Sequence, residues 1–320
     1  MARFSLPICR ACAIPAAISL AAGCGFHAPG GPDGAPPPDD AAPASPCLGR
    51  WRDDTVTLGA PTLIAELASA DVDRDPYLTP DELTIYFSTT RNATPAGVAD
   101  VYTAKRTSLS APFGAPQRVN EISSPDYDSR FSMSASELIG VVASSRAGTE
   151  GNSDLWIATR ADKSVPFGTF QAAMGLPNVN SSDHELDPEV SADGLRIYLA
   201  VSFPQRIMVS QRTSLGSTFG SVQQVQGVAA GTGSDADPSL SPDERIIAFA
   251  STRGSSDGDL YYATRTDKDA AFSTPIRVPN VNANGANDGD PTLSADGCRL
   301  YFASDRSGNW ELYAAAVTPL

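Results

Sequence analysis

Pairs of acidic residues recur along the chain, each just ahead of a short predicted strand. If these strands line one channel, their carboxylates gather at its mouth, and clustered oxygen ligands are what hard cations prefer. The weak metal-site candidates are Asp73, Asp75, Asp126, Asp128, Asp235, Asp237, Asp288 and Asp290, and Glu185 with Asp187 forms the fifth pair. The alternative, which we favour, is that one Asp in each repeat caps backbone N–H groups of a connecting loop.

Other residues that could support catalysis are scarce. The only histidines are His27 and His184, and His27 lies in a segment rich in Pro and Gly. Residues 254–258 match the Gly-x-Ser-x-Gly phrase of a nucleophile elbow, but they lie in the polar turn between two predicted strands and not between a strand and a helix. Paired carboxylates can hydrolyse glycosides, and five-bladed propellers host such chemistry. A catalytic pair should break the symmetry of the repeats, however, whereas these acids recur in every copy. We therefore predict no catalytic residues, no cofactor and no enzymatic activity.

The elements that must position these acids belong to a repeat of about fifty residues. Each copy has an Asp before a short strand, a Ser/Thr–Pro/Ala–Asp turn (Ser–Ala–Ser in the second copy), an apolar strand, a polar turn and an aromatic strand. The copies begin at Asp75, Asp128, Asp187, Asp237 and Asp290, at intervals of 53, 59, 50 and 53 residues. Such a period, built from short strands, is typical of a propeller blade. The second strands are apolar on both faces, as a sheet packed between two others requires.

The fourth strand of each blade follows a Phe, and its position predicts how the ring closes. This strand comes after Phe113, Phe167, Phe219 and Phe272, but the chain ends before the fifth copy. The matching phrase stands at the front, around Pro61. We therefore predict an all-β fold, a five-bladed β-propeller of four-stranded blades whose N-terminal strand closes the last blade and removes a free edge.

An Arg ends the second strand in four blades, and a carboxylate begins the third. The pairs are Arg91 with Asp100, Arg146 with Asp154, Arg253 with Asp259, and Arg306 with Glu311. Because these positions face each other across a hairpin, we predict an ion pair in each. Blade 3 has Phe203 and Arg206 instead.

The combination of Asp–Pro, Ser–Pro–Asp or Ser–Ala–Asp–Gly, and Asp–Leu–Tyr resembles the WD40-like repeat of TolB-type propellers, which occur in bacterial envelope proteins. The resemblance covers about residues 58–317. It implies a binding module, and the predicted function is a non-catalytic envelope scaffold that binds a protein or glycan partner. The alternative is an extracytoplasmic carbohydrate-active enzyme on a five-bladed propeller, which asymmetric, pocket-facing carboxylates with raised pKa values would favour. A structural spacer is a third option.

The N-terminus resembles a bacterial lipoprotein signal. Arg3 and Arg10 precede a small-residue apolar stretch that runs to Cys24. Residues 1–23 are then the signal peptide, Cys24 carries the lipid, 24–50 form a disordered tether rich in Pro, Gly and Ala, and 51–320 form the propeller. Gly25 implies the outer membrane in such signals. The alternative is an ordinary secretory signal that is cut nearby.

Charge and cysteine usage limit the partners and suggest one crosslink. The net charge of −14 argues against nucleic acid and against a basic membrane patch. We predict a monomer that meets the membrane only through its lipid. Cys9 and Cys12 lie in the signal peptide. Cys298 lies in a turn on the face where the closing strand starts, and Cys47 precedes that strand, so we predict a Cys47–Cys298 disulfide. A free, buried Cys298 is the alternative.

Overall fold

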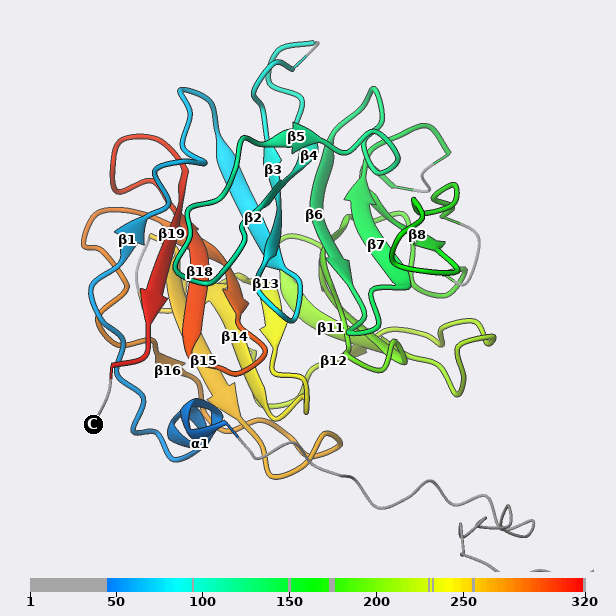
Figure 1. Ribbon diagram of the computed structural model, residues 1–320. Helices are drawn as coiled ribbons and strands as arrows, with labels where there is room; N and C mark the ends of the chain where they lie inside the picture. Colours follow the sequence, from blue (N-terminus) through cyan, green and yellow to red (C-terminus); the bar gives the residue numbers. More distant parts are fainter. Residues whose placement is uncertain are drawn as a thin grey trace, which may run out of the picture. The chain divides into compact units, whose positions relative to one another are not determined.

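The computed structural model describes residues 45–93, 95–148, 151–172, 176–229, 231, 233–254 and 257–318. The predicted signal peptide, Cys24 and residues 25–44 of the predicted tether lie outside these ranges. The described residues form one helix and nineteen strands, and the strands make five sheets around a common axis (Figure 1). None of the described segments has the length and hydropathy of a membrane-spanning helix.

Each sheet is one blade, and its strands run in order from the channel to the outside. Blade 1 has β2 (Asp73–Leu78), β3 (Thr84–Thr89), β4 (Asp100–Lys105) and β5 (Gln117–Arg118); blade 2 has β6 (Asp128–Met133), β7 (Ile139–Ser144) and β8 (Asp154–Thr159). Blade 3 has β9 (Glu185–Val190), β10 (Arg196–Val201), β11 (Arg206–Gln211) and β12 (Gln223–Gln224). Blade 4 has β13 (Asp235–Leu240), β14 (Ile246–Ser251), β15 (Asp259–Thr264) and β16 (Ile276–Arg277); blade 5 has β17 (Asp288–Leu293), β18 (Arg299–Ser304), β19 (Glu311–Ala316) and β1 (Thr62–Leu63). In blade 2 a single bridge between Ile157 and Gln171 stands in place of the fourth strand.

The second strands are buried on both faces because each sheet packs between two neighbours. Every residue of β7 and β14 is buried. Phe87 of blade 1 and Tyr301 of blade 5 belong to one buried cluster, which joins the last blade to the first. The same junction contains a buried polar contact, in which the Tyr301 hydroxyl donates to Glu82 Oε2 at 2.6 Å. The five-bladed fold predicted from the repeat is confirmed.

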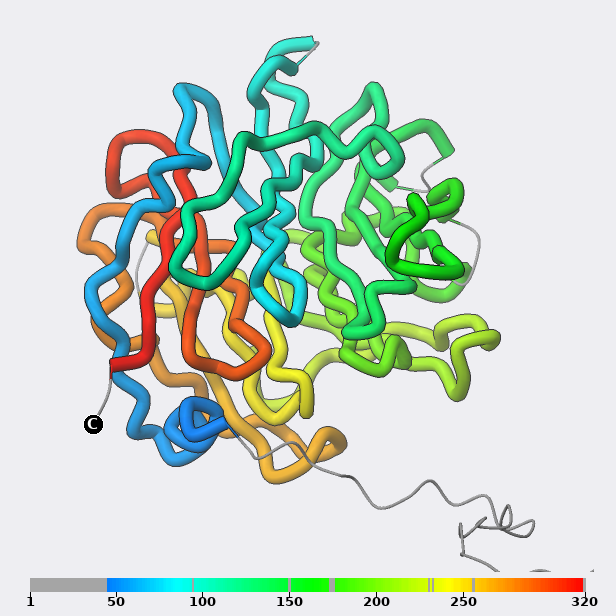
Figure 2. Tube along the Cα trace, in the orientation of Figure 1, coloured from blue at the N-terminus to red at the C-terminus, as the bar shows by residue number. Residues whose placement is uncertain are grey.

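The N-terminal strand closes the last blade, as the repeat predicts. Thr62 pairs with Ala314 and Leu63 with Tyr313, in antiparallel register. The blue segment that contains β1 therefore runs beside the red C-terminal strand (Figure 2). This pairing covers the edge of β19 that would otherwise be exposed to edge-to-edge association.

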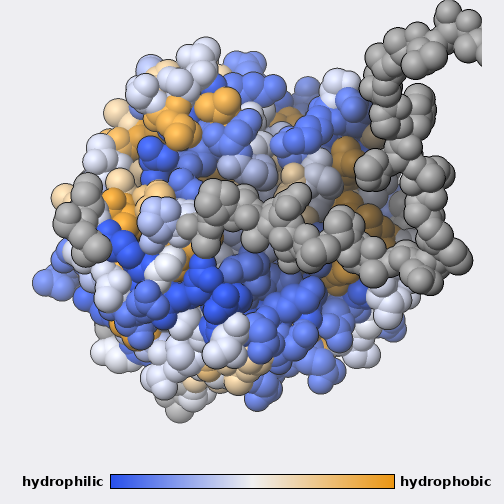
Figure 3. Space-filling model, turned by 60° about the horizontal axis from the view of Figure 1, so that its bottom comes forward, coloured by the Kyte–Doolittle hydropathy of each residue, from blue (hydrophilic) through white to orange (hydrophobic). Residues whose placement is uncertain are grey.

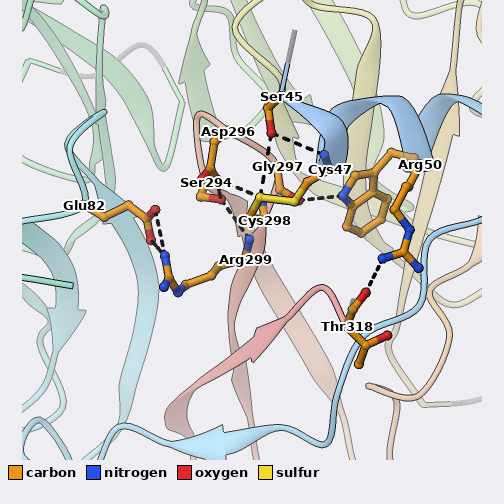
Figure 4. The surroundings of a disulfide bond; sticks show 11 residues. Ser45, Cys47, Arg50, Glu82, Ser294, Asp296, Gly297, Cys298, Arg299 and Thr318 are labelled. Carbon is orange, nitrogen blue, oxygen red and sulfur yellow. Dashed lines mark hydrogen bonds and ion pairs between the residues drawn. A yellow bond between two sulfur atoms is a disulfide. The ribbon is translucent and has the colours of Figure 1, made fainter. Parts of the chain in front are cut away.

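Helix α1 (Pro46–Arg52) precedes the closing strand and packs on the propeller. The indole N–H of its buried Trp51 donates to the Gly297 carbonyl oxygen at 2.8 Å. A disulfide joins Cys47 to Cys298, across 251 residues of sequence (Figure 4). Residues 45–50, assigned to the tether from the sequence, are thus part of the folded structure. The surface at this end is mixed, with hydrophilic residues over much of it and apolar residues in patches (Figure 3).

We expect the Cys47–Cys298 disulfide to stabilise the propeller because it restricts the unfolded chain over a long loop. Replacing both cysteines with Ala should lower the free energy of unfolding by about 2–4 kcal/mol. Urea unfolding with and without a reductant measures this effect. The reductant should lower the wild-type midpoint and leave the double variant unchanged, whereas a wild-type midpoint that resists full reduction would contradict the prediction.

Candidate functional site

Five residues, one from each inner strand, surround the channel at one end. This central ring consists of Asp75, Arg130, Asp187, Asp237 and Asp290. Each is the third residue of its strand, each has a positive φ, and none is more than 9% exposed. The pairing register with the second strand shifts at this point in every blade. Such bulges re-aim side chains, and positive φ costs a non-Gly residue about 1–3 kcal/mol, which is typical of functional sites.

The ring corrects the sequence alignment of the second repeat. Asp128 was aligned with Asp75, but the structure places it at the first position of its strand, level with Asp73. The residue in the ring is Arg130, so the ring is not a symmetric set of acids. Asp126 is exposed in the preceding loop. The intervals from Asp75 to Arg130 and from Arg130 to Asp187 are therefore 55 and 57 residues.

The first position of four inner strands holds a buried carboxylate that pairs with an Arg. The pairs are Arg91–Asp73, Arg146–Asp128, Arg253–Asp235 and Arg306–Asp288, at 2.5–2.6 Å. The sequence predicted that each Arg pairs with the carboxylate at the start of the third strand, and this prediction is wrong. Asp100 and Asp259 of the third strands pair with Arg118 and Arg277 of the fourth. Phe203 takes the Arg position in blade 3, where Glu185 accepts from Ser181.

The candidate cation ligands are thus divided between ion pairs and the ring. Within the described ranges, no group of three or more His, Cys, Asp or Glu side chains is arranged to hold a metal ion. The ring carboxylates instead accept backbone N–H groups from the next blade. Asp237 accepts from Asp290 N at 3.1 Å, Asp290 from Asp75 N at 3.4 Å, and Asp75 from Arg130 N at 3.2 Å. Capping therefore occurs between neighbouring blades. The predicted capping of the connecting loop is also present, because Asp128 accepts from Ser124 N, Asp288 from Ala283 N and Glu185 from Ser181 N.

Asp290 is the ring carboxyl group that is held ionised. Arg74 donates to both of its oxygens, at 2.8 and 3.0 Å, and stacks on the Trp310 ring at 4.1 Å. Burial favours the neutral form of Asp290, but the charge and hydrogen bonds of Arg74 hold its pKa below the usual range.

The other three ring carboxyl groups have raised pKa values. Burial, followed by the charge of Asp290, raises the pKa of Asp75 to about 7. Burial, followed by the charge of Asp75, raises the pKa of Asp187 to about 6. Burial, followed by the charge of Asp290, raises the pKa of Asp237 well above its ordinary value. Near neutral pH the ring therefore holds protonated and ionised carboxyl groups together.

Arg130 supplies a buried positive charge beside these acids. Its side chain is fully buried, and Nη2 donates to the carbonyl oxygens of Pro238 and Pro291 at 3.1 and 3.2 Å. The same nitrogen lies 3.7 Å from Glu189 Oε2. Burial raises the pKa of Glu189 to about 7, although Arg130 acts in the opposite direction. Arg130 therefore limits the repulsion within a cluster of buried acids.

The ring opens into a cavity of about 270 Å³, the mouth cavity. Asp75, Asp187, Asp237 and Asp290 line it, with Tyr127, Gln205 and Arg74. The carboxyl groups with raised pKa values thus face a space that can admit a ligand. The sequence singled out Asp75, Asp237 and Asp290 only as weak metal candidates, and it missed Arg130 as a ring residue.

Comparisons with known proteins place the fold but not a family. No protein-family model matches the chain, and no curated protein matches it. The GH43_1 enzyme from Xanthomonas citri, complexed with xylotriose, has a TM-score of 0.54 and 15% identity over 84% of this chain and 92% of that chain. The α-L-arabinofuranosidase from Podospora anserina, in complex with cellotriose, has a TM-score of 0.54 and 12% identity over 82% and 96%. TolB from Acinetobacter baumannii has a TM-score of 0.46 and 14% identity over 79% and 56%.

These findings correct the predicted function. The sequence favoured a non-catalytic scaffold that is not an enzyme, on the premise that identical acids recur in every blade. The ring contradicts this premise, because Arg130 breaks its symmetry and its carboxyl groups differ in pKa. The matches with TM-scores of 0.50 or more include structures named as glycoside hydrolases and arabinofuranosidases. The prediction of a non-catalytic scaffold is therefore wrong in its premise.

Proposed function

We propose that the protein is a glycoside hydrolase whose active site is the mouth cavity. The observation that carries this proposal is that carboxyl groups from separate blades line one cavity, where their surroundings raise the pKa of Asp75 and hold that of Asp290 low. Glycoside hydrolysis needs this combination, because one carboxylic acid protonates the leaving oxygen while a carboxylate activates water. The shared fold of named arabinofuranosidases supports the proposal as an analogy.

In this mechanism Asp75 is the general acid and Asp187 the general base. Asp187 takes a proton from a water molecule, whose oxygen forms the new bond to the anomeric carbon. The bond from that carbon to the leaving oxygen breaks, and Asp75 gives its proton to the leaving oxygen. The two residues come from blades 1 and 3, and both line the mouth cavity.

The remaining ring residues support these two roles. Asp290, kept ionised by Arg74, raises the pKa of Asp75 and so keeps the acid protonated. Outside the ring, the Gln205 side chain donates to Asp187 Oδ2 at 3.4 Å and orients the base. The negative charges in the ring also favour the positive charge that develops on the sugar in the transition state.

The pH dependence of hydrolysis tests the assignment. We expect sugar release from arabino- or xylo-oligosaccharides, the first classes to test because of the named structures that share the fold. The rate should rise with pH through about 6 as Asp187 ionises, and fall above about 7 as Asp75 loses its proton. Chromatography of the products across this range measures both limbs. Release that does not exceed that of an Asp75→Asn/Asp187→Asn double variant would exclude the proposal.

We also propose that the enzyme is attached to the cell envelope, at the outer membrane, through a lipid on Cys24. The support is the signal-like N-terminus and the place where the chain enters the propeller. Ser45 Oγ lies 3.7 Å from Cys298 Sγ. Cys298 is in the hairpin between β17 and β18, at the end of these strands opposite Asp288 and Asp290. The described chain therefore enters the propeller at the end opposite the mouth cavity.

A further inference from the structure

The mouth cavity is not closed equally on all sides, because the residue beside each ring residue differs in size. This second position of the inner strand holds Arg74, Ser129, Leu186, Ala236 and Gly289 in blades 1 to 5. Blades 4 and 5 have the smallest side chains. Blades 4 and 5 therefore leave space beside the ring, and the Arg74 side chain of blade 1 reaches across to Asp290 and Trp310 of blade 5 at the edge of this space.

A second cavity of about 190 Å³ lies over blades 4 and 5 and continues the mouth cavity. The two share Arg74, Gln205, Ala236 and Asp237 in their linings. We call this second cavity the side groove. The mouth cavity alone is smaller than the roughly 300–1,000 Å³ of ligand pockets, but the two cavities together fall within that range.

The lining of the side groove combines a half-buried aromatic ring with fixed polar groups. Trp310 forms one wall, and Gly289 lies beside it. A Cβ atom on Gly289 would be 3.7 Å from the Trp310 ring and 3.4 Å from Asp237 Oδ2. The side chain of Asn287 is held by Asp305 and by the backbone N–H of Gly258. Arg74 stacks on this ring, and the Cη2 edge of the ring faces Gly289. An aromatic edge with preset hydrogen-bonding groups suits a hydroxylated molecule that also has C–H groups.

We propose that the side groove holds the sugar unit next to the one bound at the ring, so that the enzyme acts on neutral oligosaccharides. This inference rests on the proposed function. The sugar at the scissile bond occupies the mouth cavity between Asp75 and Asp187. Its neighbour passes over Ala236 and Gly289 and lies against Trp310.

Gly289→Leu tests the groove, because a side chain there fills it without touching the proposed acid or base. The φ of Gly289 is not positive, and an added Cβ makes only ordinary van der Waals contacts. Trp310 is a poorer target, since it stacks on the Arg74 that holds Asp290. The matched control is Gly216→Leu, where an added Cβ meets nothing within 4 Å.

The substrates are xylotriose, arabinotriose and the corresponding monosaccharide fluorides, whose leaving group is a single atom. We expect Gly289→Leu to lower kcat/KM for the hydrolysed trisaccharide by about tenfold or more, and to leave the fluoride nearly unchanged. Gly216→Leu should match the wild type on both. A wild type that hydrolyses the trisaccharide while Gly289→Leu slows neither substrate, or slows both equally, overturns the side groove but not the proposed function. A wild type that hydrolyses neither overturns both.

Discussion

Replacing Asp187 with Asn should lower the rate of oligosaccharide hydrolysis by about 10²–10⁴-fold, the usual contribution of a general base. Asn keeps the shape of the side chain and can accept a hydrogen bond, but it cannot take the proton from water. Asp75→Asn should reduce oligosaccharide hydrolysis to a similar extent, because the leaving oxygen then departs without a proton. Initial rates at about pH 6.5, between the two titrations, measure both effects.

A substrate whose leaving group needs no proton distinguishes the general acid Asp75 from the general base Asp187. Fluoride leaves without protonation, so Asp75→Asn should retain most of its activity on a glycosyl fluoride, whereas Asp187→Asn should lose activity on both substrates. Asp126→Asn is the matched control, since Asp126 is an exposed acid outside the ring. Equal losses on fluoride and oligosaccharide in both ring variants would contradict the assignment of acid and base.

The sequence predicts the fold well because each repeat shows its strands and turns in short stretches of neighbouring residues. The turn after each inner strand and the apolar second strand recur in every copy, so five blades follow from the period. The phrase around Pro61 predicts the pairing of β1 with β19, and the turn containing Cys298 lies at the end where α1 enters. Both the β1–β19 pairing and the Cys47–Cys298 disulfide follow from the symmetry of the repeat, because it predicts the position of the strand that the fifth copy lacks.

The ring was misread because the second repeat was aligned by residue identity. Asp128 matches the other Asp residues by type, but its strand has Phe131 where the others have Pro. The turn gives the correct register: Thr79 follows Asp75 by four residues, and Ser134 follows Arg130 by the same four. Counting back from the turn would therefore have placed Arg130 in the ring.

The chemistry of the site could not be predicted from the sequence, because it arises between blades. The pKa of Asp75 depends on burial and on Asp290, which is 215 residues away in sequence. The Arg74 that holds Asp290 ionised belongs to another blade. Equivalent acids thus acquire different protonation states from unlike neighbours, and this difference is what a catalytic pair needs.

Arg130→Met should lower the free energy of unfolding by about 3–5 kcal/mol near neutral pH, because it leaves buried carboxylates without their cation. Met fills much of the same volume, so the loss is mainly electrostatic. The charge of Arg130 lowers the pKa values of Asp75, Asp237 and Glu189. Without it these pKa values rise further above those of the unfolded chain.

The pH dependence of this loss distinguishes charge from packing. A carboxyl group whose pKa is raised by folding contributes stability below its unfolded pKa, and that stability is lost as pH rises through the folded pKa. The stability gap between wild type and Arg130→Met should therefore widen between about pH 5 and about pH 8, as measured by urea unfolding. Arg118→Met, which removes a partly exposed partner of Asp100, should cost no more than about 1 kcal/mol at either pH. A gap that stays constant with pH would mean that Arg130 acts through packing alone and does not set the charge of the ring.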